Sequence, residues 1–230
     1  MSGLRLLAPI AVQALCEELV AQFEEVNGVP VSMSFLLNPE VPERLREGDT
    51  PDLVLTSPAD MEALIAADLV SRDMHRPFGR LSLALGRSCE MTDPLRTVPE
   101  LRDFLRDARE IAYTEGGVSG PEFLAALEEL GLTEELGDRL HPMGAGEPAR
   151  AAAAGKVDLA AAPLPVILST VGLNPVAILP RTLGTDADIS MSLTLPGQDR
   201  DAAHDLLNHF SNEESDPLLK EHGVARFSFD

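Results

Sequence analysis

The regular alternation of short apolar segments with amphipathic segments constrains the fold of this chain more than any other feature. Residues 4–8 read as a strand, and residues 11–27 carry apolar side chains at the spacing of a helix that ends at Asn27-Gly28. Residues 29–36 then alternate as a second strand. Because strands continue to alternate with helices, the pattern predicts an α/β fold with a mostly parallel sheet and ligands at the carboxyl ends of its strands.

The same reading extends along the chain. Strands are expected at 4–8, 29–36, 51–57, 80–87, 110–115, 157–163, 175–180 and 189–197. Helices are expected at 11–27, 39–48, 58–70, 120–132, 148–156, 164–172, 200–212 and 216–223. Pro58 suits the first turn of its helix, where the missing N–H costs nothing.

A chain of 230 residues suits one large domain or two lobes of about 100 residues each. We predict two lobes. Lobe 1 comprises residues 1–88 together with 183–230, and lobe 2 comprises residues 89–182, so that the chain crosses between them twice.

Charge limits the partners. With 38 acidic and 18 basic residues, the formal net charge is −20, which disfavours nucleic acid and anionic membranes. No apolar run approaches the roughly 18 residues of a membrane span. A small-molecule ligand is therefore the expected partner, and a small anion is allowed because it responds to local donors. The sequence gives no indication of the oligomeric state.

The first segment also bears on location. Arg5 and Pro9 interrupt its apolar run, and Glu17 and Glu18 follow closely, which fits a strand and a helix better than a secretion signal. We therefore expect a cytoplasmic protein. Cys16 lies on the apolar side of the first helix and is expected to be a buried thiol.

No metal or cofactor is expected. The two cysteines have neither zinc-site nor disulfide-framework spacing, and no His, Cys or Asp cluster has metal-ligand spacing. The nucleotide-binding and nucleophile-elbow fingerprints do not occur. His204, His209 and His222 are expected to face solvent on the last helices.

Five stretches, in this order, resemble a known family. They are "LRLLAPIAVQALCEELVAQFEEVNGVPVSMSF", "RLREGDTPDLVLTSPADMEALIAADLV", "IAYTEGGVSGPEFLAALEELGL", "AAAAGKVDLAAAPLPVIL" and "DAAHDLLNHFSNEESDPLLKEHGVARF". Together they resemble the type 2 periplasmic-binding-protein fold, in its molybdate-binding-protein-like branch. The resemblance implies two lobes, each a mixed, mostly parallel sheet flanked by helices. It also implies a cleft between them in which helix N-termini and hydroxyls hold an oxyanion or carboxylate. The family includes transporter-associated binding proteins and enzymes such as aconitate isomerase.

The chain departs from the molybdate binders where they place ligand hydroxyls. The serine after the first strand of those proteins corresponds to Ala11, and the next turn carries Leu37 and Asn38. A third turn reads "APLP" at 162–165. Each missing charge-assisted hydrogen bond is worth about 1.5–3 kcal/mol. We therefore expect a larger, partly apolar organic ligand rather than molybdate, in a cleft rimmed by Pro9, Ile10, Leu36, Leu37, Pro163 and Leu164.

Polar candidates for the ligand lie mainly in "YTEGGVSG", residues 113–120. Thr114, Ser119 and the N–H groups of Gly116, Gly117 and Gly120 fit an anion-binding nest. A glycine-rich connection with Ser119 as helix N-cap is the alternative. Tyr113 suits either ligand contact or core packing.

Two further residues have paired interpretations. Arg80 can bind a ligand carboxylate with two hydrogen bonds or can form an intramolecular ion pair. Ser57 can contact ligand or cap the helix that starts at Pro58.

The resemblance leaves the function open. Our first hypothesis is an isomerase that moves a proton next to a carboxylate or carbonyl, with His141 or Glu115 as acid/base group. The alternative is a non-catalytic solute-binding protein or sensor for a small organic anion. A third possibility is an interaction module that has lost its site.

Overall fold

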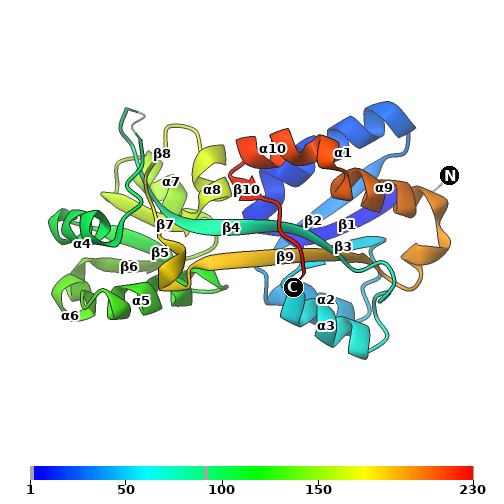
Figure 1. Cartoon of the computed structure of the whole chain (residues 1–230), viewed down its shortest axis with the longest axis horizontal. Helices are drawn as coiled ribbons and strands as arrows, with labels where there is room; N and C mark the ends of the chain where they lie inside the picture. The colour runs from blue at the N-terminus through cyan, green and yellow to red at the C-terminus, as the bar shows by residue number, and fades with distance from the viewer. Residues whose placement is uncertain (1–2, 91–92, 230) are drawn as a thin grey trace. The chain divides into compact units, whose positions relative to one another are not determined.

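The computed structural model describes residues 3–90 and 93–229, which form two compact units. Unit 1 comprises Met1–Arg80 and Asp188–Asp230, and unit 2 comprises Leu81–Ala187. The chain passes between them inside strands β4 (Arg76–Arg87) and β9 (Asp186–Leu193) (Figure 1). The sequence places these crossings near residues 88 and 182. The predicted outer ends at 1 and 230, and residues 91–92 of predicted lobe 2, lie outside the described residues.

The sheet of unit 1 has the strand order β2 (Val31–Leu36), β1 (Leu4–Pro9), β3 (Leu53–Thr56), β9. β1 runs parallel to β2 and β3, whereas β9 runs antiparallel to β3. Pro9 pairs with Leu36 in register. The carboxyl ends of β1, β2 and β3 therefore share one edge of the sheet.

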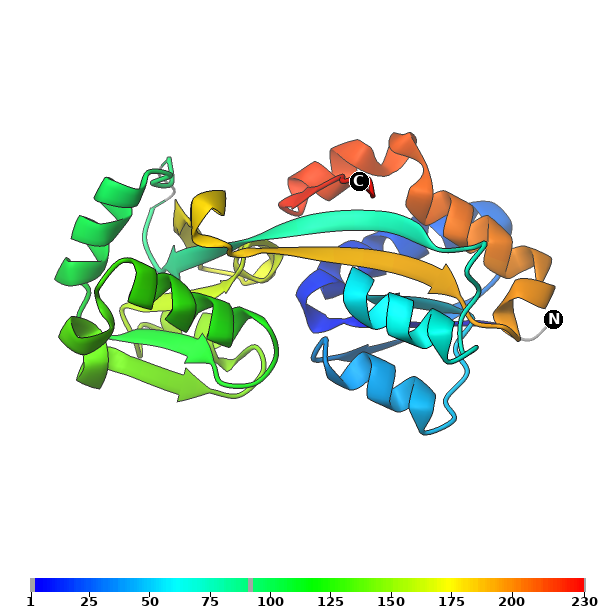
Figure 2. The ribbon, with the colours of Figure 1, turned by 60° about the horizontal axis from the view of Figure 1, so that its bottom comes forward.

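Helices cover both faces of this sheet. α1 (Gln13–Asn27), α9 (Asp201–Ser211) and α10 (Asp216–Glu221) lie on one side, and α2 (Glu40–Arg46) and α3 (Pro58–Ala66) lie on the other (Figures 1 and 2). A core cluster under α2 and α3 contains Leu7, Val41, Leu45, Val54, Met61, Leu64, Ile65 and Val70.

The first helix forms as its sequence predicts. Leu15, Leu19 and Phe23 are buried one turn apart, and Gly28 ends the helix at φ +66°, a conformation that glycine adopts at little cost. The prediction for Cys16 is confirmed, because the thiol is fully buried. Burial, and secondarily the charge of Glu17, raises the pKa of this thiol.

A buried carboxylate joins distant segments of unit 1. Asp52 accepts hydrogen bonds from the backbone N–H of Arg5 at 2.8 Å and from Nη1 of Arg200 at 2.7 and 2.8 Å. The Asp52 N–H donates to the Arg5 carbonyl at 2.8 Å. These contacts connect β1, the start of β3 and the residue before α9.

Unit 2 is built on the strand order β4, β7 (Leu159–Pro163), β5 (Ile111–Thr114), β6 (Leu140–Met143), with β8 (Asn174–Ile178) paired to β4. β5 runs parallel to β6 and β7, and Thr114 pairs with Met143 in register. The ends of these three strands therefore lie along one edge. β4 is antiparallel to β7.

Two apolar layers enclose this second sheet. One lies under α4 (Val98–Asp107), α5 (Ser119–Glu129) and α6 (Thr133–Leu136), and Phe123 is buried within it. The other lies under α7 (Glu147–Ala153) and α8 (Leu164–Ser169), where alanines of β7 allow close packing. Short 3₁₀ turns, η1 (Ile10–Val12), η2 (Gly137–Arg139), η3 (Arg181–Leu183), η4 (Gly197–Asp199) and η5 (Glu213–Ser215), and strand β10 (Val224–Ala225) complete the fold.

The eight predicted strands and eight predicted helices all occur with shifted ends, and α4, β6, α6 and β10 were not among them. Within residues 3–90 and 93–229, no helix is both long and apolar enough to cross a membrane. The predicted exposure of three histidines is wrong. The Nε2 atoms of His204, His209 and His222 lie within 3.0 Å of the Gln198 carbonyl, the Leu19 carbonyl and the Glu18 carboxylate, and all three side chains are partly buried.

Candidate functional site

The first strand-to-helix turn of unit 1 lacks side-chain oxygens. Pro9 ends β1 in an extended conformation and starts η1 without any side-chain cap. Ile10 and Ala11 follow and are partly exposed. Leu37 is also partly exposed, in the neighbouring turn after β2, and its N–H donates to Glu40 Oε2 at 2.9 Å. These two turns thus present apolar side chains at the edge where ligands bind in α/β sheets.

The polar side chains at this edge are gathered around Asp60. Ser57 Oγ donates to Asp60 Oδ2 at 2.7 Å, and Asn38 Nδ2 donates to the same oxygen at 3.3 Å. Thr56 Oγ1 donates to Asn38 Oδ1 at 3.4 Å. The Asp60 N–H in turn donates to Ser57 Oγ at 3.2 Å, so Ser57 is the N-cap of α3. The Ser57 hydroxyl and the Asn38 amide are therefore directed at a carboxylate of the protein.

Sequence reasoning missed Asp60. The signal was available, because Ser57 and Asp60 have the S-x-x-D spacing related to a capping box. The pattern does not show that Asn38, from the preceding connection, would complete the cluster.

In unit 2 the loop after β5 leads directly into α5. The Glu115 N–H donates to the Met143 carbonyl at 2.9 Å, and Gly117 has φ +79°. Val118 is the residue before the helix and offers no side-chain cap, so the alternative of Ser119 as N-cap is wrong. Among the hydrogen bonds of residues 3–90 and 93–229, none involves the hydroxyl of Thr114 or Ser119. Thr114 is buried and Ser119 is partly buried.

Gly120 brings α5 against the end of β5. A Cβ atom at this position would lie 1.9 Å from the Thr114 carbonyl oxygen. Because this oxygen belongs to the backbone, it cannot move aside as the end of a flexible side chain can. The loop 114–120 therefore depends on glycine at this position for its shape.

We expect Gly120→Ala to lower the free energy of unfolding by about 1–3 kcal/mol, because the new methyl group overpacks a fixed backbone. Chemical denaturation followed by far-UV circular dichroism measures this change. Ser119→Ala is the matched control and should stay within about 0.5 kcal/mol of the parent protein. Equal stability of the two variants would contradict the close packing at Gly120.

Glu122 is the unusual titrating group of unit 2. Burial, and then the negative charge of Asp186, raises the pKa of Glu122 to about 7. Asp186 accepts a hydrogen bond from Ser82 Oγ at 3.0 Å and forms an ion pair with Arg181 Nε at 2.8 Å. Glu122 therefore holds its proton at pH values where an ordinary glutamate is ionised.

This raised pKa predicts a pH dependence of stability. A glutamate in the unfolded chain ionises near pH 4.3, so between about pH 4 and 7 the folded protein binds the extra proton. The free energy of unfolding should therefore fall as pH rises through this interval. Glu122→Gln should weaken the dependence, whereas Glu128→Gln, at an exposed position of the same helix, should retain it. Denaturation midpoints at pH 5 and pH 8 test this, and an unchanged slope in Glu122→Gln would refute it.

The remaining predicted residues have defined positions. Arg80 forms a bidentate pair with Asp188 through Nε at 2.5 Å and Nη2 at 2.7 Å, which is the ion-pair alternative. The ring centroid of Tyr113 lies 6.2 Å from that of Phe123, and Tyr113 packs against the unit 2 core. His141 lies inside β6 with its side chain 39% exposed and Nε2 4.0 Å from Glu110 Oε1.

The structure thus brings the predicted residues together in two sets. At the strand edge of unit 1 lie Pro9, Ile10, Ala11, Leu37, Asn38 and Ser57. At the strand edge of unit 2 lie Thr114, Glu115, Gly117, Ser119, Gly120, Pro163 and Leu164. Arg80 lies within β4 and His141 within β6, away from these strand ends.

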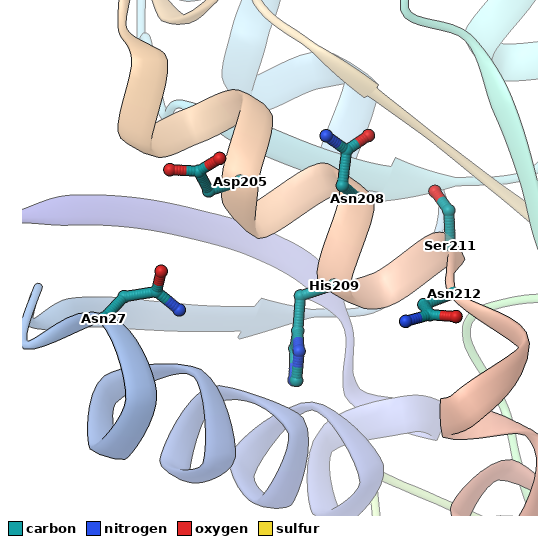
Figure 3. Close-up of a pocket in the computed structure, with 6 residues that line it drawn as sticks. All are labelled: Asn27, Asp205, Asn208, His209, Ser211 and Asn212. Atoms are coloured by element: carbon teal, nitrogen blue, oxygen red, sulfur yellow. The ribbon is translucent and has the colours of Figure 1, made fainter.

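A surface pocket of about 490 Å³ lies elsewhere in unit 1 (Figure 3). Asn27 from α1 and residues at the end of α9 line it, and the full set is Asn27, Asp205, Asn208, His209, Ser211 and Asn212. Several of these polar groups already bond to the protein; for example, Asn27 Nδ2 donates to the Phe23 carbonyl at 3.1 Å. No predicted site residue lines this pocket.

The family model of the bacterial extracellular solute-binding proteins matches residues 4–225. The chain belongs to this family. This solute-binding protein has an α/β two-lobed periplasmic-binding-protein fold, so the predicted fold class is confirmed. No curated protein sequence matches it significantly.

Solved structures share the fold of this solute-binding protein at low sequence identity. The periplasmic molybdate-binding protein of Azotobacter vinelandii is 17% identical, with TM-score 0.81 and coverage of 96% of this chain and 98% of the other. The sulfate-binding protein SubI of Mycobacterium tuberculosis is 15% identical, with TM-score 0.73 and coverage of 97% and 86%. PEB3 of Campylobacter jejuni, solved with L-phospholactate bound, is 12% identical, with TM-score 0.69 and coverage of 97% and 100%.

Family membership corrects the predicted activity and the predicted location. The isomerase hypothesis is wrong, because the family and these neighbours are solute binders, and the catalytic roles of His141 and Glu115 fall with it. No comparison supports the aconitate-isomerase-like branch. The cytoplasmic prediction is also wrong, since the family is extracellular.

Proposed function

We propose that this solute-binding protein binds a small organic anion with at least one carboxylate group and releases it chemically unchanged. The observation that supports this choice over a bare tetrahedral oxyanion is the cluster around Asp60. Ser57 and Asn38 donate to Asp60 rather than pointing unpaired from the sheet edge. A dianion at this edge would meet a negative charge and few available donors.

Each unit presents apolar groups at its own strand edge, which supports an organic solute. Ile10 and Leu37 are partly exposed at the strand edge of unit 1, and Pro163 and Leu164 are partly exposed at the strand edge of unit 2. Carbon atoms of a solute gain free energy by covering such surface, whereas molybdate and sulfate have none. The neighbour PEB3, solved with L-phospholactate bound, supports an organic anion as the solute.

The loop 114–120 is the proposed carboxylate site. It offers the hydroxyls of Thr114 and Ser119 and the N–H groups of a glycine-rich turn. Hydroxyl and backbone N–H donors suit a carboxylate, and each charge-assisted bond is worth about 1.5–3 kcal/mol.

Calorimetric titration of the whole protein with succinate, malate, citrate, L-phospholactate, sulfate and molybdate tests the proposal. At least one carboxylate should bind, and proton spectra of that ligand incubated with the protein in heavy water should show neither exchange nor a new product. Thr114→Val combined with Ser119→Ala should weaken binding at least tenfold, and Ser34→Ala, at an exposed position of β2, should not. Binding of sulfate or molybdate without any carboxylate would refute the proposal.

A further inference from the structure

The C-terminal strap, residues 224–229, lies along β4 in unit 1 and is anchored at one end only (Figure 1). Its first part is held by hydrogen bonds, because β10 pairs with β4 and Arg226 Nη1 donates to the carbonyl oxygens of Phe78 at 3.2 Å and Phe210 at 2.9 Å. By contrast, none of the hydrogen bonds found in the described part of the chain involves residues 227–229. The end of the C-terminal strap can therefore detach while its beginning stays in place.

Ring contacts hold the end of the C-terminal strap against unit 1. The ring centroid of Phe229 lies 4.5 Å from that of His75 and 5.7 Å from that of Phe227. The guanidinium carbon of Arg80 lies 5.6 Å from the centroid of the Phe227 ring. Because Arg80 also pairs with Asp188, these contacts form one continuous series from His75 to β9.

One ring nitrogen of His75 is buried without a partner. The His75 side chain is only 10% exposed, and its Nε2 atom has no hydrogen-bond partner among the described residues. Nδ1 lies 3.5 Å from Glu62 Oε1, so this carboxylate favours the single proton of the neutral ring on Nδ1. A second proton would be placed on Nε2, where it would form a buried N–H group without an acceptor. An aromatic ring such as that of Phe229 accepts a hydrogen bond only weakly.

The charged groups around His75 belong to three segments. Glu62 lies on α3, Arg72 lies in the connection after α3, and Arg76 begins β4. Burial lowers the pKa of His75; the charge of Glu62 opposes this effect, and the charges of Arg72 and Arg76 add to it. The C-terminal strap contributes the uncharged ring of Phe229. The packed strap therefore favours the neutral ring, whereas detachment of its end lets water reach the ring and returns the pKa toward its ordinary value of about 6.5.

We propose that the C-terminal strap is an acid-sensitive latch, in which protonation of His75 releases Phe227 and Phe229 from unit 1 while β10 and Arg226 stay in place. The open form binds the proton more strongly than the closed form. The latch is therefore closed above about pH 6.5 and opens more readily as pH falls below this value. Opening also removes the Phe227 ring from Arg80 of β4. A member of an extracellular family meets the pH of its surroundings, so acid can act on this latch directly.

Fluorine NMR of the whole protein labelled with 4-fluorophenylalanine tests the latch. Phe227→Leu and Phe229→Leu assign the two signals. As pH is lowered from 8 to 5, which is above the range in which ordinary carboxyl groups titrate, both signals should move at least halfway to their positions in a labelled peptide of residues 226–230. In His75→Leu, which keeps an apolar contact without a titrating group, the signals should not move. His204→Gln, which changes another partly buried histidine of unit 1, should respond like the parent.

A reciprocal measurement tests the latch even if His75→Leu fails to fold. Phe229→Ala removes the ring that packs on His75, so the midpoint of the His75 titration, followed by proton NMR, should rise by at least about 0.5 pH unit, which is about a threefold gain in proton affinity. Val26→Ala, at an exposed position of unit 1, should leave that midpoint unchanged. Signals that stay in place at pH 5 in the parent, signals that move equally in His75→Leu, or an unchanged midpoint in Phe229→Ala would each overturn the inference.

Discussion

Replacing Asp52 by alanine is expected to lower the free energy of unfolding by about 3–5 kcal/mol, because it removes a buried carboxylate together with its hydrogen bonds to Arg200 and to the Arg5 backbone. The Asp52 side chain is only 8% exposed. It also accepts the Arg5 N–H, so the variant loses a contact at the start of the β1–β3 pairing.

Asp49→Ala is the matched control, three residues earlier. Asp49 pairs with Arg5 and Arg44 at the surface, and despite partial burial these arginines lower the pKa of its carboxyl group. Exposed pairs contribute about 0–1 kcal/mol, so this variant should be close to the parent. Urea unfolding followed by far-UV circular dichroism is the appropriate measurement, since the chain has no Trp and one Tyr. Similar losses in both variants would contradict the central role of Asp52.

Phe123→Ala is expected to cost about 3–5 kcal/mol by leaving a cavity between α5 and the sheet of unit 2. Phe123 is completely buried, among residues of α4, α5 and β5. Its ring lies near Tyr113 of β5, so removal of the ring also removes support for the strand that precedes the loop 114–120.

Phe104→Ala separates cavity formation from loss of aromatic surface. Phe104 is only partly buried, and its ring lies 5.1 Å from the Arg87 guanidinium. Water can fill the space that this substitution opens, so we expect a loss clearly smaller than that of Phe123→Ala. The same denaturation experiment compares the two variants. An equal or larger loss of unfolding free energy for Phe104→Ala would show that Phe123 is not at the centre of the unit 2 core.

Most of the fold could be predicted from sequence because periodicity and capping are local. The apolar spacing of 11–27 and the glycine after Asn27 fix α1, and the continuous apolar segments predict β1 and β3. The helix α4 was missed although Leu101, Phe104 and Leu105 have helical spacing, because so short a segment contains few such positions. β6 was missed because Pro142 and His141 interrupt its apolar character.

The candidate site was only partly predictable because its decisive contacts join separate elements. Strand ends identify Leu37, Ser57 and Thr114, but the Asn38–Asp60 hydrogen bond depends on how α2 and α3 pack. The exposure of His209 was mispredicted for the same reason, since its partner Leu19 belongs to α1. Function was mispredicted because one scaffold supports both binding and catalysis, and residue types alone do not distinguish them.

The double passage of the chain between the two units has a consequence for biosynthesis. On a ribosome, residues 81–187 are complete as a continuous stretch before the part of β9 that pairs with β3 has been made. β3, whose Leu53, Val54 and Leu55 are fully buried in the finished protein, lacks its β9 neighbour during that entire interval. The part of the molecule translated first is therefore the last to close, and its unpaired apolar edge is where a chaperone would be most needed during synthesis.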